Sequence, residues 1–194
     1  GMGLGFIQIG CFGTICPRTT ENFVKIATEE AKSKIWDNTL RYAGTELHRI
    51  VPNHLIQGGD VHNLGGVGGE SVFGQMFQDE NFYLKHDQKY VVAMANKGRD
   101  TNASQFYITL KKKISALDGK NVVFGIVMNG REVLDFIAER YGSIDGKPKK
   151  KVFIAWAGMS FGWRMIPINA DDPPTDFVLE DHWNFTSPSK LKVD

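Results

Sequence analysis

The run LHRIVPNHLIQGGD, residues 47–60, constrains the fold more than any other stretch of this chain. Pro52 fixes its own φ and favours an extended conformation at the residue before it, and Asn53 tolerates the left-handed conformation that a tight turn needs. We therefore predict a β-hairpin that reverses at Asn53. With that centre, Arg49 and Gln57 become cross-strand neighbours whose side chains leave the same face of the sheet.

Two interpretations of this polar pair are open. Five apolar residues surround it: Leu47, Ile50, Val51, Leu55 and Ile56. Long polar side chains that lie against apolar surface can grip one ligand together, and the following Gly58-Gly59 lets backbone approach closely. The other interpretation is a solvated edge hairpin with an ordinary surface arginine. The hairpin alone does not decide between a binding site and a surface turn.

Length and charge narrow the class of protein. The chain has 194 residues and a formal net charge of +1, so we expect one domain with its own core and no nucleic-acid or membrane partner. No apolar run approaches the ~20 residues of a membrane span, and the first residues lack the pattern of a signal peptide. Cys11 and Cys16 match neither a redox pair nor a zinc-ligand spacing. We expect reduced thiols, hence a reducing compartment and a cytoplasmic location.

The remaining pattern indicates many short strands and two helices. Besides the hairpin, we expect strands over residues 5–12, 90–94, 105–110, 122–127 and 152–158. Helices are expected over residues 17–31 and 132–141. Residues 32–44 lose periodicity and suggest a long loop anchored by Trp36 and Tyr42. This order favours a β-barrel or sandwich closed at its ends by helices.

The sequence changes character near Met159. The segment Asp171-Asp172-Pro173-Pro174 and sparse aromatic residues indicate an extended appendage. We therefore divide the chain into a domain over residues 1–158 and a C-terminal extension over residues 159–194. His62, His86 and His182 have no cysteines or carboxylates at ligand spacing, so we predict no metal site.

A second stretch, MANKGRDTNASQFYITL at residues 94–110, gives the hairpin a context. Together the two stretches resemble the substrate groove of the cyclophilin-type peptidyl-prolyl cis-trans isomerases. Seven ordered motifs between about Gly5 and Gly158 carry the resemblance: PRTTENF, HRIVPN, IQGGD, GGESVFGQMFQDENF, MANKG, SQFYIT and LDGKNVVFG. The resemblance implies a mainly β fold, a closed antiparallel barrel of roughly eight strands capped by two helices, and no cofactor.

The resemblance also implies roles for residues. Arg49 takes the place of the family's catalytic arginine, which is expected to donate hydrogen bonds to the prolyl carbonyl and amide nitrogen. Five residues match the groove that holds the peptide: Gln57, Ala95, Asn96, Gln105 and Leu117. An X-Pro bond isomerises once its partial double-bond character is weakened, so the reaction needs neither a nucleophile nor a metal.

Five other groove positions depart from the family's usual residues. His54 and Tyr107 stand where phenylalanine is common and Leu55 where methionine is common, which predicts a more polar proline pocket. After one inserted residue, Ala116 falls where many members carry tryptophan, and Asn121 falls where they carry histidine. Losing an indole from an interface commonly costs a few kcal/mol. We therefore expect weak cyclosporin binding and slow turnover.

Two further expectations follow from the same alignment of motifs. Relative to the family, the chain enters at the equivalent of the second strand, so the first strand is expected to be missing and two sheet edges exposed. Phe177-Val178-Leu179 in the extension is a candidate to cover that gap. Glu70 is expected to pair on the surface with the run Lys111–Lys113.

The leading hypothesis is a monomeric prolyl isomerase that acts on X-Pro bonds in proteins or peptides and aids folding or conformational switching. The alternative is a feeble or inactive cyclophilin-like module that binds a proline segment, or that serves as a scaffold through residues 32–44 and the extension. His54 and Tyr107 favour the binding module, whereas Arg49, Gln57 and Gln105 favour the enzyme.

Overall fold

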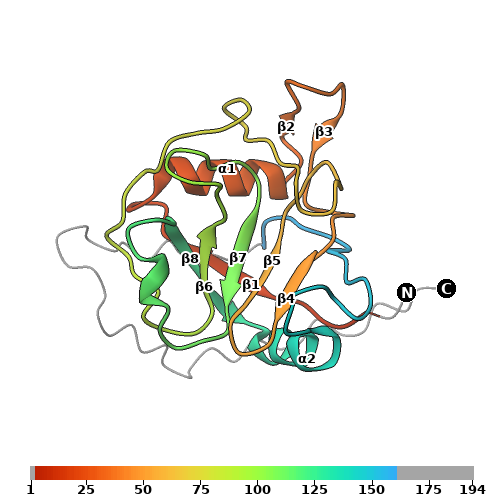
Figure 1. The fold of residues 1–194 in the computed structure, drawn as a ribbon. Helices are drawn as coiled ribbons and strands as arrows, with labels where there is room; N and C mark the ends of the chain where they lie inside the picture. The colour runs from red at the N-terminus through yellow and green to blue at the C-terminus, as the bar shows by residue number, and fades with distance from the viewer. Residues whose placement is uncertain (1–2, 161–194) are drawn as a thin grey trace.

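The computed structural model describes residues 3–160, which form one antiparallel sheet with a helix at each end (Figure 1). The strands are β1 (Gln8–Cys11), β4 (Arg49–Val51), β5 (Leu55–Gly58), β6 (Val91–Met94), β7 (Phe106–Thr109) and β8 (Val123–Asn129). They are hydrogen-bonded in the order β1-β8-β6-β7-β5-β4, so β1 and β4 are the edges of this ladder. A separate two-stranded ribbon joins β2 (Ala31–Lys32) to β3 (Thr39–Leu40). The mainly β prediction with two capping helices is confirmed.

The helices begin where the sequence signals place them. Helix α1 (Pro17–Ala27) has proline at its start, and its first free amides, those of Arg18 and Thr19, donate to the carboxylate of Glu80 at 2.9 and 2.8 Å. It ends four residues before the predicted Ala31, because the chain turns out of the helix at Glu29, where φ is +60°. Helix α2 (Arg131–Tyr141) is predicted to within one residue.

The core lies between the sheet and α1. Four aromatic rings make its centre, with centroids 5.1–5.2 Å apart: Phe23, Tyr42, Phe106 and Phe124. Since successive side chains of a strand point to opposite faces, Phe106 enters this core while Tyr107 faces the other way. Tyr107 belongs to a second, smaller apolar cluster on the middle strands.

Two predictions of local structure are wrong. Residues 32–44 are not only loop, because they contain most of the β2–β3 ribbon. Tyr42 anchors this region by donating from its buried hydroxyl to the carbonyl of Ser104 at 2.9 Å, but the Trp36 side chain is 55% exposed. Residues 152–158 do not form a strand. They make only one isolated bridge, between Phe153 and Glu46, since the neighbouring chain stays alongside them for only a few residues.

Two further expectations concern the C-terminal extension and the membrane. Phe177-Val178-Leu179 lies beyond the described residues. Within residues 3–160, no helix has the length and hydrophobicity that crossing a membrane requires.

Candidate functional site

The predicted hairpin is present in the predicted register. Asn53 has φ +57° at the turn between β4 and β5, and Arg49 pairs directly with Gln57 across the two strands. The guanidinium Nη1 of Arg49 donates to Oε1 of Gln57 at 3.4 Å. Both side chains therefore leave the same face of the sheet.

A chain of hydrogen bonds orients these two side chains. The amide nitrogen of Gln105 donates to the carbonyls of Gly66 and Gly68, at 2.9 and 2.6 Å. Both of its amide protons are thus used, so its oxygen is left to accept from Nε2 of Gln57 at 2.9 Å. That contact turns Oε1 of Gln57 toward Arg49. Two backbone carbonyls of the glycine-rich loop, residues 65–74, therefore set the direction of every hydrogen bond in this chain.

The glycine-rich loop is in turn held by one buried carboxylate. Oδ2 of Asp60 accepts from the backbone amides of Leu64, Gly66 and Gly68 at 2.8–3.2 Å. A carboxylate that accepts several amides replaces the hydrogen bonds an irregular loop would otherwise lack. Asp60 thereby fixes the carbonyls on which Gln105 depends.

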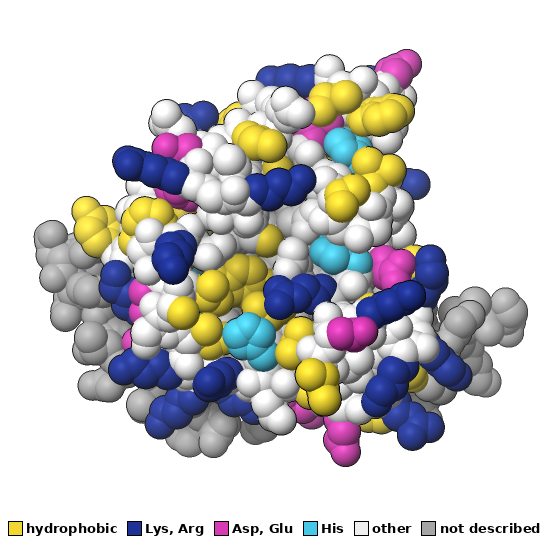
Figure 2. Space-filling model, in the orientation of Figure 1, with side chains coloured by type: hydrophobic (Ala, Val, Ile, Leu, Met, Phe, Trp, Pro, Cys, Tyr) yellow, Lys and Arg dark blue, Asp and Glu magenta, His cyan; other side chains and the backbone are white. Residues whose placement is uncertain are grey.

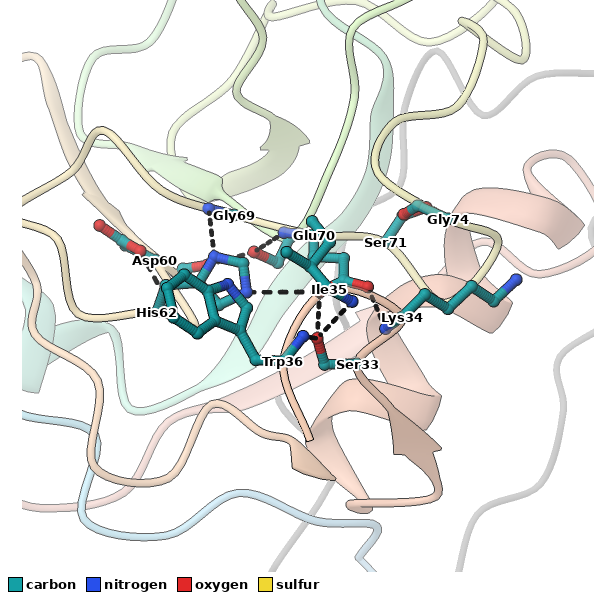
Figure 3. A network of polar contacts seen from close by, with 12 residues as sticks. Ser33, Lys34, Ile35, Trp36, Asp60, His62, Gly69, Glu70, Ser71 and Gly74 are labelled. Carbon is teal, nitrogen blue, oxygen red and sulfur yellow. Dashed lines mark hydrogen bonds and ion pairs between the residues drawn. The ribbon is translucent and has the colours of Figure 1, made fainter. Parts of the chain in front are cut away.

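A second carboxylate ties this loop to the β2–β3 ribbon (Figure 3). Glu70 is fully buried, and it accepts from the Ser33 hydroxyl at 2.6 Å and from the Lys34 amide at 2.5 Å. Its backbone amide donates to the Ser104 hydroxyl at 3.3 Å, next to Gln105. The expected surface pairing of Glu70 with Lys111–Lys113 is therefore wrong, because the ribbon folds over this side chain and supplies its donors.

His62 completes that network with a defined tautomer. Its Nδ1 accepts from the Gly69 amide at 3.4 Å, so in the neutral ring the proton is assigned to Nε2, which lies 3.3 Å from the Glu70 carboxylate. The Trp36 ring packs against the imidazole, with centroids 5.9 Å apart. These contacts join the ribbon and the glycine-rich loop into one wall beside the groove.

The apolar side of the groove is built on the middle strands. Its residues are Leu55, Val91, Ala93, Tyr107 and Val123, with Leu84, Ala95 and Leu117 packed against them. Figure 2 shows apolar side chains gathered in a hollow on this face of the molecule. Four of the predicted groove residues, Leu55, Ala95, Tyr107 and Leu117, thus belong to one cluster. Gln57, which belongs to the polar chain that ends at Arg49, pairs with Tyr107 across β5 and β7. The polar chain therefore lies next to the apolar cluster.

The hydroxyl of Tyr107 points away from solvent. It lies 2.7 Å from Nε2 of buried His86, whose Nδ1 lies 2.8 Å from the carboxylate of Asp118. With Nδ1 donating to Asp118, Nε2 accepts from the tyrosine hydroxyl. The expectation that Tyr107 makes the proline pocket more polar is therefore wrong, since its only polar atom is used beneath the pocket.

The sequence matches the family model described as cyclophilin type peptidyl-prolyl cis-trans isomerase/CLD over residues 1–159. The chain belongs to this family. It is 44% identical over 155 residues to peptidyl-prolyl cis-trans isomerase B of Saccharomyces cerevisiae, which covers 80% of this chain and 73% of that protein. It is also 44% identical over 158 residues to peptidyl-prolyl cis-trans isomerase CYP21-1 of Arabidopsis thaliana, covering 81% and 70%. This cyclophilin is therefore a prolyl isomerase, and its substrates are proline-containing peptides.

Domains of this family occur in proteins of very different length. The NK-tumor recognition protein of Mus musculus is 41% identical over 157 residues, which cover 80% of this chain but only 11% of that protein. A domain of this type thus occurs both as most of a protein and as a small part of one.

The four remaining predicted residues lie outside that apolar cluster: His54, Asn96, Ala116 and Asn121. His54 is half-buried, and burial first, then the charges of Arg49 and Lys111, lowers its pKa below the usual value. Ala116 is exposed on the short 3₁₀ turn Ser115–Leu117. The side-chain amides of Asn96 and Asn121 donate to the carbonyls of Lys120 and Met94, at 2.7 and 2.9 Å, and so tie their own loops together. These bonds bring Asn96 and Asn121 together, and the role of all four residues in peptide binding stays a prediction.

Sequence reasoning missed four polar residues that hold the groove: Asp60, Glu70, His86 and Asp118. The local signal for Asp60 was present, because an acidic residue directly before a glycine-rich loop is a natural acceptor for its amides. For the other three no local signal existed, since their partners lie 21 to 37 residues away along the chain.

Proposed function

We propose that Arg49 is the catalytic residue of this cyclophilin and that the cluster around Leu55, Tyr107 and Leu117 receives the proline ring. The observation that carries the proposal is the oriented chain from Gly66 and Gly68 through Gln105 and Gln57 to Arg49. A long cationic side chain that is aimed by a fixed partner loses less conformational freedom when it engages a substrate.

The chemistry requires only that the prolyl amide lose its conjugation. The barrier of about 18–20 kcal/mol comes from the partial double bond between carbonyl carbon and nitrogen. In the twisted transition state the nitrogen becomes pyramidal and gains a lone pair, which accepts a hydrogen bond from the Arg49 guanidinium. A donor that bonds the nitrogen only in this state lowers the barrier without tightening substrate binding.

The neighbouring groups position the peptide. Gln57 and the backbone of Asn96 hold the chain extended, while Ala95 and Gln105 lie along the same groove. His54, Ala116 and Asn121 form its rim. The apolar cluster excludes water from the amide, which strengthens the electrostatic contribution of Arg49.

The test is exchange NMR on a proline peptide with the protein at catalytic concentration. Arg49→Ala is expected to lower kcat/KM about 100-fold, the usual size of losing one positioned transition-state donor. Arg49→Lys should recover only part of the rate, because lysine keeps the charge but lacks the planar fork. Arg140→Ala, at an exposed arginine on α2, is the matched control and should leave the rate unchanged. Equal rates for wild type and Arg49→Ala would contradict the assignment.

A second candidate function is a slow or inactive module that binds proline segments. The observation that favours it is His54, a polar ring on the groove rim flanked by the charges of Arg49 and Lys111. Tyr107 no longer supports it, because the tyrosine hydroxyl is bonded to His86. Line broadening on peptide addition without faster exchange would favour this module.

The exposed Ala116 offers no large side chain for contact, and we propose on this ground that cyclosporin binds weakly. We also propose that the protein acts as a monomer. A submicromolar cyclosporin dissociation constant by calorimetry, or a dimer by sedimentation, would contradict the respective statement.

A further inference from the structure

A cavity opens beside Asn96 and Asn121, two of the residues predicted to line the proline groove. Its volume is about 530 Å³, far above the ~30 Å³ that one water molecule occupies in the liquid. Asn96 and Asn121, both predicted groove residues, form part of its wall. The other lining residues are Asp79, Phe82, Gly98, Arg99, Gly119 and Lys120. The cavity is therefore continuous with the place where the peptide is expected to lie.

The wall shared with the groove has a fixed backbone. Asn96 donates from Nδ2 to the carbonyl of Lys120 at 2.7 Å and accepts from the amide of Gly98 at 3.4 Å. Asn121 donates to the carbonyl of Met94 at 2.9 Å. These bonds join two loops that are distant in sequence, and they bring Arg99 and Lys120 to the same cavity.

The carboxylates near this cavity are already engaged. Asp79 and Asp100 bond reciprocally, since the amide of each donates to the carboxylate of the other at 2.9 Å. Asp79 also accepts from the side chain of Asn102 at 2.8 Å. The contact of Arg99 with Asp100, at 3.5 Å, is a weak surface pair because the Arg99 side chain is 91% exposed.

Lys120 is exposed and makes no ion pair within residues 3–160. Lys97, the residue after Asn96, is a further exposed cation next to a lining residue of the cavity. Figure 2 shows Lys and Arg side chains around the apolar hollow on this face. The cavity lining itself holds two cations, Arg99 and Lys120, and one carboxylate, Asp79.

We propose that this cavity is a subsite for a negatively charged side chain close to the substrate proline, with Arg99 and Lys120 as its cationic partners. The proposal rests on the proposed function of the groove, because the subsite is useful only to a peptide that lies along Asn96 and Asn121. The shared ligand chemistry is an anionic group on a short side chain, supplied either by Asp or Glu or by a phosphorylated Ser or Thr. The selected substrates are acidic or phosphorylated proline segments.

The experiment compares peptides in which Glu or its neutral isostere Gln stands at each position within two residues of the proline. Exchange NMR at low ionic strength gives kcat/KM for each pair. At one position the Glu peptide should be preferred about fivefold, the size expected from two exposed ion pairs. A phosphoserine peptide at that position should exceed its serine counterpart by more than Glu exceeds Gln, if phosphate is the better ligand. Preference for Glu alone would identify a carboxylate site.

The double variant Arg99→Gln/Lys120→Gln should bring the Glu-to-Gln ratio close to one, and so should about 1 M salt, where the screening length falls to about 3 Å. Lys32→Gln, which removes an exposed charge on the β2–β3 ribbon, should leave the ratio as it is. A ratio of one at every position in the wild type would overturn the subsite while leaving prolyl isomerisation intact. If no peptide is turned over, the proposed catalytic function fails separately. The subsite is then tested by the ratio of the dissociation constants of the Glu and Gln peptides, measured by calorimetry.

Discussion

Two hydrogen-bonded chains support the two sides of the groove, and they differ in kind. The first runs from the glycine-rich loop through Gln105 and Gln57 to Arg49, and its links before Arg49 are backbone carbonyls and side-chain amides. The second runs from Tyr107 through His86 to Asp118 and has a histidine at its centre. The first chain ends in the exposed cation of Arg49, whereas the second begins at the buried side chains of Tyr107 and His86.

The two chains have different tasks, since one orients Arg49 and the other holds the ring of Tyr107. The hydrogen bond between Gln57 and Gln105 joins uncharged amides, so it aims Arg49 without any change of protonation in these two side chains. On the apolar side, the ring of Tyr107 forms part of the pocket while His86 accepts from its hydroxyl, which fixes the ring without placing a polar atom in the pocket. We expect damage to the first chain to reduce both catalysis and stability, and damage to the second chain to reduce stability alone.

The largest effect in this comparison is expected for Gln105→Ala. The change leaves the carbonyls of Gly66 and Gly68 without their donor and Gln57 without its acceptor. We expect a loss of about 2 kcal/mol in the free energy of unfolding and a fall in kcat/KM of about tenfold or more. Chemical denaturation and exchange NMR measure the two quantities. Gln75→Ala, at an exposed glutamine, is the control, and a stability loss without any loss of rate would show that Arg49 does not depend on this chain.

A smaller effect on the free energy of unfolding is expected from a change of pH. It should arise from His86 in the second chain and from two other partly buried histidines, His48 and His54. Burial, the largest cause, lowers the pKa of His86 below its usual 6.5 despite the contacts with Asp118. As pH falls through 6.5 the unfolded chain binds a proton that the folded chain does not, so the free energy of unfolding should fall by about 1 kcal/mol between pH 7.5 and 5.5. Thermal melts across this range provide the measurement.

Asp118 does not contribute to this slope, the change of the free energy of unfolding between about pH 7.5 and 5.5. Burial raises its pKa, but the hydrogen bonds from His86 outweigh this and leave the pKa below the usual 3.8, so its contribution is lost only at lower pH. The slope should shrink in His86→Asn and persist in part, because burial also lowers the pKa of His48 and His54. An unchanged slope in His86→Asn would exclude His86 as a source of it.

The smallest effect is expected for Tyr107→Phe, which keeps the ring but leaves Nε2 of His86 without a donor. The free energy of unfolding should fall by about 1 kcal/mol, the usual contribution of one neutral hydrogen bond. Tyr141→Phe is a matched control, since the hydroxyl of Tyr141 makes no hydrogen bond within residues 3–160. Equal stability of the wild type and Tyr107→Phe would mean that the second chain adds no stability.

The sequence by itself determined those features that depend on neighbours along the chain. Pro52 and Asn53 placed the turn, and with it the pairing of Arg49 with Gln57 and the common face of their side chains. Proline at the start of α1, the short apolar runs of β6 and β7, and the sequence pattern of α2 were sufficient in the same way. Each of these signals acts over a few residues, where propensity and period decide the outcome.

Only the tertiary structure decided what distant groups do to one another. Glu70 has the local pattern of a surface charge, and it is buried because Ser33 and Lys34 of the ribbon fold over it and supply hydrogen bonds. Tyr107 changes the pocket less than its hydroxyl suggests, because His86, 21 residues away, takes that hydroxyl out of the groove. The physical reason is the same in both cases. A polar atom becomes exposed or buried according to whether a partner reaches it, and partners are brought together by the fold and not by proximity in sequence.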